Sequence, residues 1–407
     1  MNWSPEALRL QFPILEREVN GLPLHYLDNA ATTFSPLCVQ DAQSRFENQY
    51  RANVQRGMHQ LGIEATDAFE AARESAAKYL NAPSPDEIIF TSGTTFAVNM
   101  VAHGLGDSLQ PGDEIVVSVA EHHSNFVPWQ RLCEQYGIQM KLIPVLATGS
   151  LDLARLDDLI SERCRVVAVS HISNVTGSIT DLQTIVRRAH HCGALVFVDG
   201  AQAVPHGPID LQSLDVDFYA FSSHKCYGPN GIGVLWGRRQ LLDDLPPFLT
   251  GGGMIERVSA QGTRYASGNR RFEAGTPPVA QAIGLGAALE WLTALPWPEI
   301  HRHERQLAER LLRGLEDIRG LTVLGEITPG GRAPIFSFDI EGCHSHDLCH
   351  VLDEFGVALR GGHHCAQPLM DALDLVATTR ASIAVFNTED DITALLDGLH
   401  KAVELLR

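Results

Sequence analysis

Short apolar runs alternate with longer amphipathic segments between residues 85 and 235 of the chain. The runs predict buried strands, and the segments between them predict helices that cover a sheet. The predicted strands are 85–92, 114–119, 139–144, 166–171, 195–199 and 218–221, with a further strand beginning near Ile232. The predicted helices are 96–102, 127–136, 153–160 and 182–191. This alternation predicts an α/β fold whose mainly parallel sheet is covered by helices on both faces.

The patterns at the two ends of the chain predict a second, smaller unit. Ser4 before Pro5 predicts a helix that begins there and ends near residues 19–21. The segment 251–271 predicts a hairpin or loop and 279–295 a helix, while 301–407 predicts helix, strand, helix and a terminal helix. We therefore expect a large domain over residues 19–295 and a smaller α/β domain formed by residues 1–18 and 296–407.

Composition and charge indicate which partners and which cellular location to expect. The 407 residues carry a net charge of -18, which argues against nucleic acid and against an anionic membrane surface as partners. The N-terminus shows no signal peptide, and the chain shows no long apolar stretch, so the sequence predicts a cytoplasmic protein. The eight cysteines are scattered without a Cys-x-x-Cys pair, which predicts reduced thiols, one of which could be reactive.

Lys225 is the first candidate for chemistry. It follows a buried strand and a pair of hydroxyls, Ser222 and Ser223, and precedes a glycine-containing turn. A lysine held at a rigid strand end suits an amine that bonds covalently to a carbonyl cofactor. An arbitrary lysine is more often a solvated surface residue, so the interpretation depends on what lies near it.

Several polar residues are predicted to lie with Lys225 at one edge of the sheet. Ligands of parallel sheets bind beyond the carboxyl ends of the strands. The polar residues that follow predicted strands are Thr94, Thr95, His123, Asn174, Asp199 and Lys225. Thr94 and Thr95 also begin a helix, where hydroxyls and free N–H groups suit a phosphate, although a threonine there is also a common helix cap.

Motifs along nearly the whole chain resemble those of the class V aminotransferase family, which uses pyridoxal phosphate (PLP). The motifs are Asp28-Asn-Ala-Ala, Gly93-Thr-Thr, Glu121-His-His-Ser-Asn, Ser173-Asn-Val-Thr-Gly, Asp199-Gly-Ala-Gln, Ser222-Ser-His-Lys-Cys-Tyr-Gly-Pro, Phe272-Glu-Ala-Gly-Thr and Arg360-Gly-Gly-His-His-Cys-Ala-Gln-Pro. The set is similar to cysteine desulfurases of the group II type, the branch shared with selenocysteine lyases. The resemblance implies the PLP-dependent transferase fold of type I.

The resemblance also implies the residues that bind the cofactor. Lys225 would form the imine, and Asp199 would keep the pyridine nitrogen protonated. His123 would stack on the ring and move protons, Gln202 would contact the phenolic oxygen, and Asn174 would contact both substrate and cofactor. The residues implied to hold the phosphate are Thr94, Thr95, Ser222, His224 and, from a neighbouring subunit, Thr276. A shared phosphate site implies a homodimer.

Cys365 distinguishes a desulfurase from other members. In that branch the matching cysteine takes the sulfur of L-cysteine as a persulfide, leaves L-alanine, and passes the sulfur to an acceptor, as in iron–sulfur cluster assembly. His363 and His364, with Arg360, predict an electropositive setting that favours the thiolate. Arg380 matches the arginine that binds the substrate carboxylate, with Arg360 nearby.

Two departures and three alternatives remain open from sequence. Gln55 stands where the family usually has histidine, and Phe96 where glutamate is common, which leaves substrate preference open. The segment Cys343–His350 is rich in cysteine and histidine, but its spacing matches no standard zinc hooks, so we predict no metal. The alternatives are a selenocysteine lyase, another class V activity such as kynureninase, and a non-catalytic sulfur-relay subunit.

Overall fold

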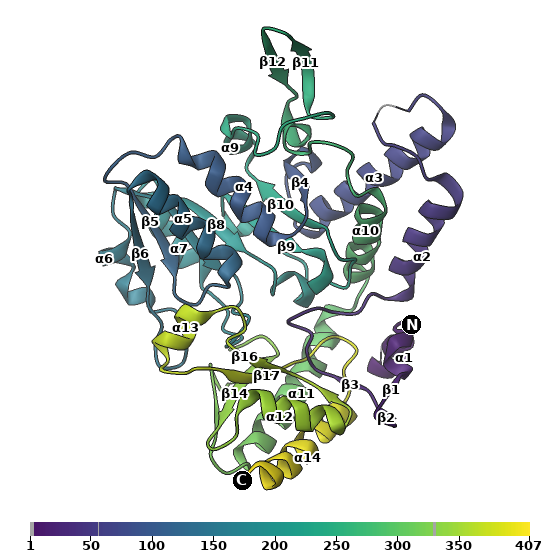
Figure 1. Cartoon of the computed structure of the whole chain (residues 1–407), viewed down its shortest axis with the longest axis vertical. Helices are drawn as coiled ribbons and strands as arrows, with labels where there is room; N and C mark the ends of the chain where they lie inside the picture. The colour runs from purple at the N-terminus through teal and green to yellow at the C-terminus, as the bar shows by residue number, and fades with distance from the viewer. Residues whose placement is uncertain (1–3, 56, 329–330) are drawn as a thin grey trace.

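The structure, a computed structural model, describes residues 4–55, 57–328 and 331–407. At its centre lies a seven-stranded sheet with the order β4-β10-β9-β8-β7-β5-β6 (Figure 1). The strands are β4 (Ile88–Thr91), β5 (Glu114–Ser118), β6 (Gln139–Ile143), β7 (Cys164–Ser170), β8 (Leu195–Asp199), β9 (Phe218–Ser222) and β10 (Gly233–Gly237). Neighbours from β9 to β6 run parallel, which confirms the predicted α/β fold with a mainly parallel sheet.

β10 runs antiparallel to both β9 and β4, which the sequence pattern did not predict. The reason is the short connection, because residues 223–232 return the chain directly alongside β9. A parallel neighbour would need a crossover of about a dozen residues or more. The turn uses left-handed backbone at Tyr227 (φ 63°) and Gly231 (φ 78°), and Lys225 is held within it.

Alternate side chains of the strands point to opposite faces, so the sheet has a core on each side. Val116 and Val196 face one core, whereas their neighbours Ile115 and Phe197 face the other. The helices are α3 (Gln60–Tyr79), α7 (Leu182–His191) and α10 (Val279–Thr293) in the first core and α4 (Thr94–Gly106) and α5 (Val127–Tyr136) in the second. Burial on both faces explains why the strands read as continuous apolar runs.

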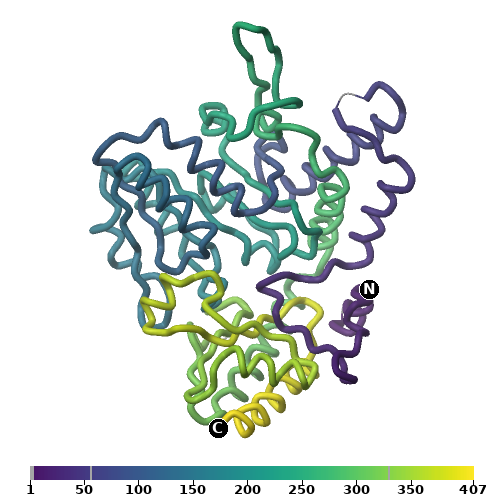
Figure 2. Tube along the Cα trace, in the orientation of Figure 1, coloured from purple at the N-terminus to yellow at the C-terminus, as the bar shows by residue number. Residues whose placement is uncertain are grey.

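A second sheet of four antiparallel strands lies below the first and is light green to yellow in Figure 2. Its strands, in sheet order, are β13 (Leu321–Val323), β14 (Ile335–Ile340), β17 (Thr378–Ser382) and β16 (Arg360–Gly362). Helices α11 (Trp297–Glu316), α12 (Ser345–Glu354) and α14 (Glu389–Leu406) share its core. The pattern predicted the helices but missed β16 and β17. The predicted domain boundaries stay a prediction.

The remaining elements are short. They include α2 (Leu37–Arg45), α6 (Leu156–Leu159), α8 (Leu211–Leu214), α9 (Arg239–Asp244), α13 (Gln367–Ala372), the strand pairs β1 (Glu18–Val19) with β2 (Leu22–Pro23) and β3 (His25–Tyr26) with β15 (Val357–Ala358), and the hairpin β11 (Ile255–Ser259) with β12 (Gly262–Tyr265). The hairpin projects from the molecule, as Figure 1 shows, and fulfils the prediction for residues 251–271. Within the described part of the chain, no single helix is both long and apolar enough to cross a bilayer. Helices α10 and α11 taken together would be long and apolar enough, but the chain bends by 85° between them.

The N-terminal prediction was wrong in its extent. Helix α1 spans only Pro5–Arg9, with Ser4 as its cap, and a 3₁₀ turn at Pro13–Glu16 follows. Pro13 explains the early end, since proline disfavours helical backbone in the residue before it, and Phe12 has φ -121° and ψ 80°. Residues 1–3 of the predicted N-terminal segment lie outside the described residues.

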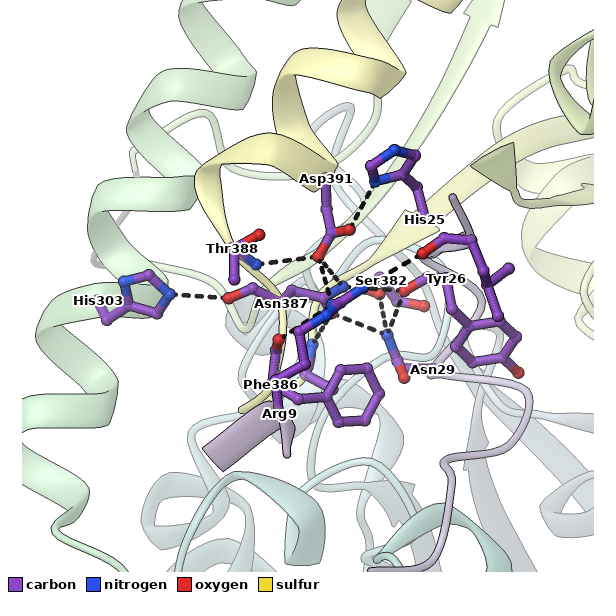
Figure 3. A network of polar contacts seen from close by, with 12 residues as sticks. Arg9, His25, Tyr26, Asn29, His303, Ser382, Phe386, Asn387, Thr388 and Asp391 are labelled. Carbon is purple, nitrogen blue, oxygen red and sulfur yellow. Dashed lines mark hydrogen bonds and ion pairs between the residues drawn. The ribbon is translucent and has the colours of Figure 1, made fainter. Parts of the chain in front are cut away.

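A buried polar network joins the N-terminal segment to the start of α14 (Figure 3). The Asp391 carboxylate is 1% exposed and binds Arg9 Nη1 at 3.2 Å and His25 Nδ1 at 2.8 Å. It also accepts hydrogen bonds from the Asn387 side chain and from the Thr388 backbone N–H, which caps α14. Burial alone would raise the pKa of Asp391, but these partners hold it below its usual value.

Replacing Asp391 with alanine should therefore destabilise the protein by about 3 kcal/mol, since it leaves buried donors and charges without a partner. Urea unfolding of the wild type and of Asp391→Ala at pH 7 measures the difference, with Asp397→Ala on the exposed face of α14 as the control. A lowered pKa in the folded state means that the contribution is present above the usual carboxyl pKa and is lost as the pH falls below it. Equal stability of the two variants at pH 7 would contradict this interpretation.

Candidate active site

A cavity of about 200 Å³ lies at the carboxyl edge of the parallel strands, bounded on its other side by β16 and β17. Most of the predicted site residues line it. They are Thr94, Thr95, Asn174, Asp199, Ser222, His224, Lys225, Arg360 and Arg380. A larger cavity of about 400 Å³ lies elsewhere, beside His206 and Glu304, and the predicted site residues do not line it. The structure thus brings these nine residues together from both sheets.

Lys225 and Asp199 face the same cavity from adjacent strand ends. Burial lowers the pKa of Lys225, while the negative charge of Asp199 acts in the opposite direction. Burial raises the pKa of Asp199, and the positive charge of Lys225 opposes that rise. Asp199 Oδ1 also accepts the Ala201 N–H at 2.9 Å, which fixes the carboxylate. The site therefore combines an amine that loses its proton readily with a held carboxylate.

The N-terminus of α4 forms the anion-binding end of the cavity. Gly93 precedes it with φ 143°, a conformation that glycine adopts readily. The Thr94 N–H and hydroxyl both lie 2.9 Å from Ser222 Oγ, so that β9 and α4 meet there. His224, whose pKa burial lowers to about 4, lies 3.3 Å from Thr32 Oγ1. Hydroxyls, a neutral imidazole and free helix N–H groups fit a phosphate.

Arg380 is buried in β17, with 2% of its side chain exposed. Its guanidinium binds Asp28 Oδ1 at 3.1 Å and the Asn174 backbone oxygen at 2.9 Å. Its Nε has no hydrogen-bond partner among the residues that the structure describes. Because buried donors are almost always paired, this atom fits a bound acceptor such as a carboxylate. Arg360 lines the same side of the cavity and adds positive charge.

Cys365 lies in the turn between β16 and α13 and is half-buried. It is not among the described residues that line the cavity, although the residue before it, His364, is. Burial lowers the pKa of His364 to about 3. His364 is therefore neutral near pH 7, and the predicted positive contribution from it was wrong. Arg360 supplies a charge that His364 does not.

The two adjacent histidines take opposite positions, which corrects the prediction for His123. His122 lines the cavity, and burial together with the charge of Lys225 lowers its pKa to about 3. His123 points elsewhere: its Nε2 accepts the Gln367 N–H at 3.2 Å, and its ring lies 5.7 Å from that of His363. The turn after β5 directs the two side chains apart, and the sequence alone could not show which one faces inward.

Gln202 and Thr276 lie outside the cavity. The Gln202 Nε2 donates to the Ala30 oxygen at 2.8 Å, and the side chain lines a space of about 10 Å³ that Lys225 also borders. Thr276 is exposed. The roles expected for these two residues stay predictions. Of the described residues, no three His, Cys, Asp or Glu side chains are placed to hold a metal ion.

Sequence reasoning missed the role of Glu121 beneath the site. Its fully buried carboxylate accepts hydrogen bonds from Ser118 Oγ, from Ser170 Oγ and N–H, and from Asn125 Nδ2 at 2.5–2.9 Å. These bonds fix the turn that carries His122 and His123 against β7. Burial raises the pKa of Glu121 to about 7, although the three partners oppose the rise. The motif Glu121-His-His-Ser-Asn named this residue without indicating its function.

Comparison with known proteins identifies the family. Residues 25–395 match the aminotransferase class-V family. The chain belongs to this family. It is 46% identical over 402 residues, covering 98% of this chain and 99% of the relative, to a probable cysteine desulfurase of Vibrio cholerae.

Two solved structures are similar to this chain in both fold and sequence. The cysteine desulfurase CsdA of Escherichia coli, in an S-sulfonic acid form, has a TM-score of 0.92 and 42% identity over 100% of both chains. A lysine-to-alanine mutant of C-DES, with glycine covalently linked to its PLP cofactor, has a TM-score of 0.82 and 26% identity over 96% of this chain and 98% of the other. The class V chain described here therefore has the type I fold of PLP-dependent transferases, as predicted.

Stability of this class V protein should depend on pH through Glu121. Because its folded pKa is raised, its contribution is fully present below the ordinary glutamate pKa and is lost as the pH rises through about 7. Between pH 5 and pH 8.5 the wild type should lose about 3 kcal/mol that Glu121→Gln does not lose. Urea unfolding at both pH values measures the difference between the two proteins, and parallel pH profiles would refute the assignment.

Proposed function

We propose that this chain is a PLP-dependent cysteine desulfurase that converts L-cysteine to L-alanine and holds the sulfur as a persulfide on Cys365. The observation that carries the proposal is the position of Cys365, which directly follows His364, a residue that lines the cavity together with Lys225. An amine alone would support many PLP activities. A thiol in the turn beside that cavity supports sulfur transfer in particular.

The residues around the cavity fit the cofactor. Thr94, Thr95, Ser222 and His224 form an anion-binding end beside the N-terminus of α4 and would hold the phosphate. Asp199 would hold the pyridine nitrogen in its protonated form, and His122, rather than His123, would pack against the ring. Gln202 would contact the phenolic oxygen. When bound, PLP supplies an aldehyde that bonds to amines and a ring that accepts electrons.

The protein groups then have distinct tasks. Arg380 and Arg360 bind the carboxylate of L-cysteine, and Nε of Arg380 is a buried donor that has no partner among the described residues. Asn174 orients the substrate beside them. Lys225, whose pKa burial lowers, would take the proton from the substrate Cα and return it elsewhere.

Cys365 takes the sulfur. Its thiolate attacks the substrate sulfur, a new S–S bond forms, and the C–S bond breaks with its electron pair left on carbon. That carbon takes up a proton and becomes the methyl group of L-alanine, so the reaction needs no external oxidant or reductant. The sulfur on Cys365 then passes to a protein acceptor. The alternative with the same fold is a selenocysteine lyase. It would use L-selenocysteine faster than L-cysteine and would not require Cys365 for that reaction.

Assembly and location complete the proposal. We infer a homodimer in which Thr276, exposed and outside the cavity of its own chain, reaches the phosphate of the neighbouring subunit. A cytoplasmic location is consistent with the thiols, because all eight cysteines are free in the structure and free thiols persist in a reducing compartment.

Cys365→Ala should abolish alanine formation from L-cysteine, with at least a hundredfold loss of rate, while the protein stays yellow with an absorbance band at about 420 nm. The physical reason is that the variant lacks the thiol but keeps every group that lines the cavity. Alanine is measured by amino-acid analysis, with Cys38→Ala, an exposed cysteine, as the control.

The alternative functions predict different results when the wild type and Cys365→Ala are compared with L-cysteine, L-selenocysteine and PLP. Full cysteine turnover by Cys365→Ala would refute the assignment. Turnover of L-selenocysteine that is fast and unaffected by the substitution would indicate a selenocysteine lyase. A colourless wild-type protein, after incubation with PLP, would indicate a non-catalytic sulfur-relay subunit.

A further inference from the structure

The turn that carries Cys365 is strained. His364 and Cys365 are consecutive residues in left-handed backbone, with φ 50° and 56°. Side chains other than glycine make this conformation costly, so it persists only where surrounding contacts hold it. The position of the Cys365 sulfur therefore depends on the groups that hold this turn.

Two contacts hold the residue before Cys365. Asn174 Nδ2 donates to the His364 backbone oxygen at 2.8 Å, and His364 Nε2 lies 3.0 Å from Thr378 Oγ1. The turn also has an internal bond from the Cys365 N–H to His363 Nδ1 at 3.1 Å. These contacts fix the chain as it enters Cys365, and just beyond it the Ala366 N–H donates to the His363 oxygen at 2.9 Å.

His123 binds the chain at Cys365 and again two residues after it. Its backbone N–H donates to the Cys365 oxygen at 2.7 Å, and its Nε2 accepts the Gln367 N–H at 3.2 Å. His123 thus joins the end of the first sheet to the segment between β16 and α13, 244 residues away along the chain. One residue therefore holds the chain at the proposed nucleophile and just after it.

We propose that His123 is the positioning residue for Cys365, holding the strained turn through its backbone N–H and its Nε2. The inference depends on the proposed desulfurase function and adds a task to it. The bond to Gln367 requires a neutral imidazole that carries its proton on Nδ1. This task differs from that of His122, which lines the cavity itself.

The surroundings of His123 favour the neutral form that the bond requires. Burial lowers its pKa, and a positive charge on the neighbouring His363 lowers it further. Protonation would place an N–H opposite the Gln367 N–H, so this form would lose the contact. The substitution His123→Gln tests this requirement, since the amide oxygen of the new side chain can accept a hydrogen bond at a similar distance from the backbone.

Rapid-quench measurement of a single turnover tests the role. One equivalent of L-cysteine is added to the PLP-bound enzyme, and persulfide on the Cys365 peptide is followed by mass spectrometry. His123→Phe should form persulfide about tenfold more slowly, the effect of losing one hydrogen bond from a held geometry. His123→Gln should restore most of the rate. Both should keep the cofactor absorbance of the wild type.

Controls separate this inference from the function on which it depends. His191→Phe, at an exposed position on α7, should react as fast as the wild type. Amide hydrogen exchange at Gln367 should be faster in His123→Phe than in His123→Gln. His123→Leu gives the same comparison with a smaller side chain if the phenylalanine variant does not fold.

The outcomes are distinct. A wild type that forms no persulfide would show that the proposed function is wrong, and the positioning role with it. A wild type that forms persulfide at the same rate as the phenylalanine and leucine variants would overturn the positioning role alone. Equal slowing in the glutamine variant would also overturn it, because the accepting atom would then not matter.

Discussion

The buried guanidinium of Arg380 is the interaction on which the site depends. Arg380 lies in the second sheet, and it binds Asp28 and the backbone of Asn174, which belong to loops beside the first sheet. A buried arginine is stable only where acceptors surround it, so the two sheets must meet at this position. The cavity between the two sheets follows from that junction.

The junction also determines the charge of the cavity. Lys225, Arg360 and Arg380 face it together, whereas Asp199 is the carboxylate that lines it. Burial lowers the pKa of both Lys225 and Arg380, so the site favours an anionic ligand and makes the lysine a weaker base. A carboxylate substrate and a phosphate would relieve the same repulsion. The mutual repulsion of the three cationic side chains is thus the source of the binding preference.

The parts of the fold that the sequence predicted are those whose burial produces a recognisable run of apolar residues. Continuous apolar runs gave the parallel strands β5 to β9, and Lys225, Asp199 and Thr94 were predicted at the correct edge of the sheet. The strand β17 was missed because its residues Thr378–Ser382 are largely polar although fully buried, so no apolar run indicates them.

The assignment of His123 failed for a related reason. Two adjacent histidines in a turn have no periodicity that shows which one faces a ligand, and only the backbone path resolves it. Likewise, Pro13 ended a helix whose apolar pattern continued. Position along a strand can be read from sequence, whereas the direction of a side chain in a turn cannot.

The central claim is that Cys365 accepts sulfur from L-cysteine. The most direct measurement is mass spectrometry of the wild-type Cys365 peptide after the PLP-bound protein reacts with L-cysteine, without reductant. We expect a gain of about 32 Da on that peptide, matched by one equivalent of alanine. Alanine without the added mass, or the added mass on a different cysteine, would contradict it.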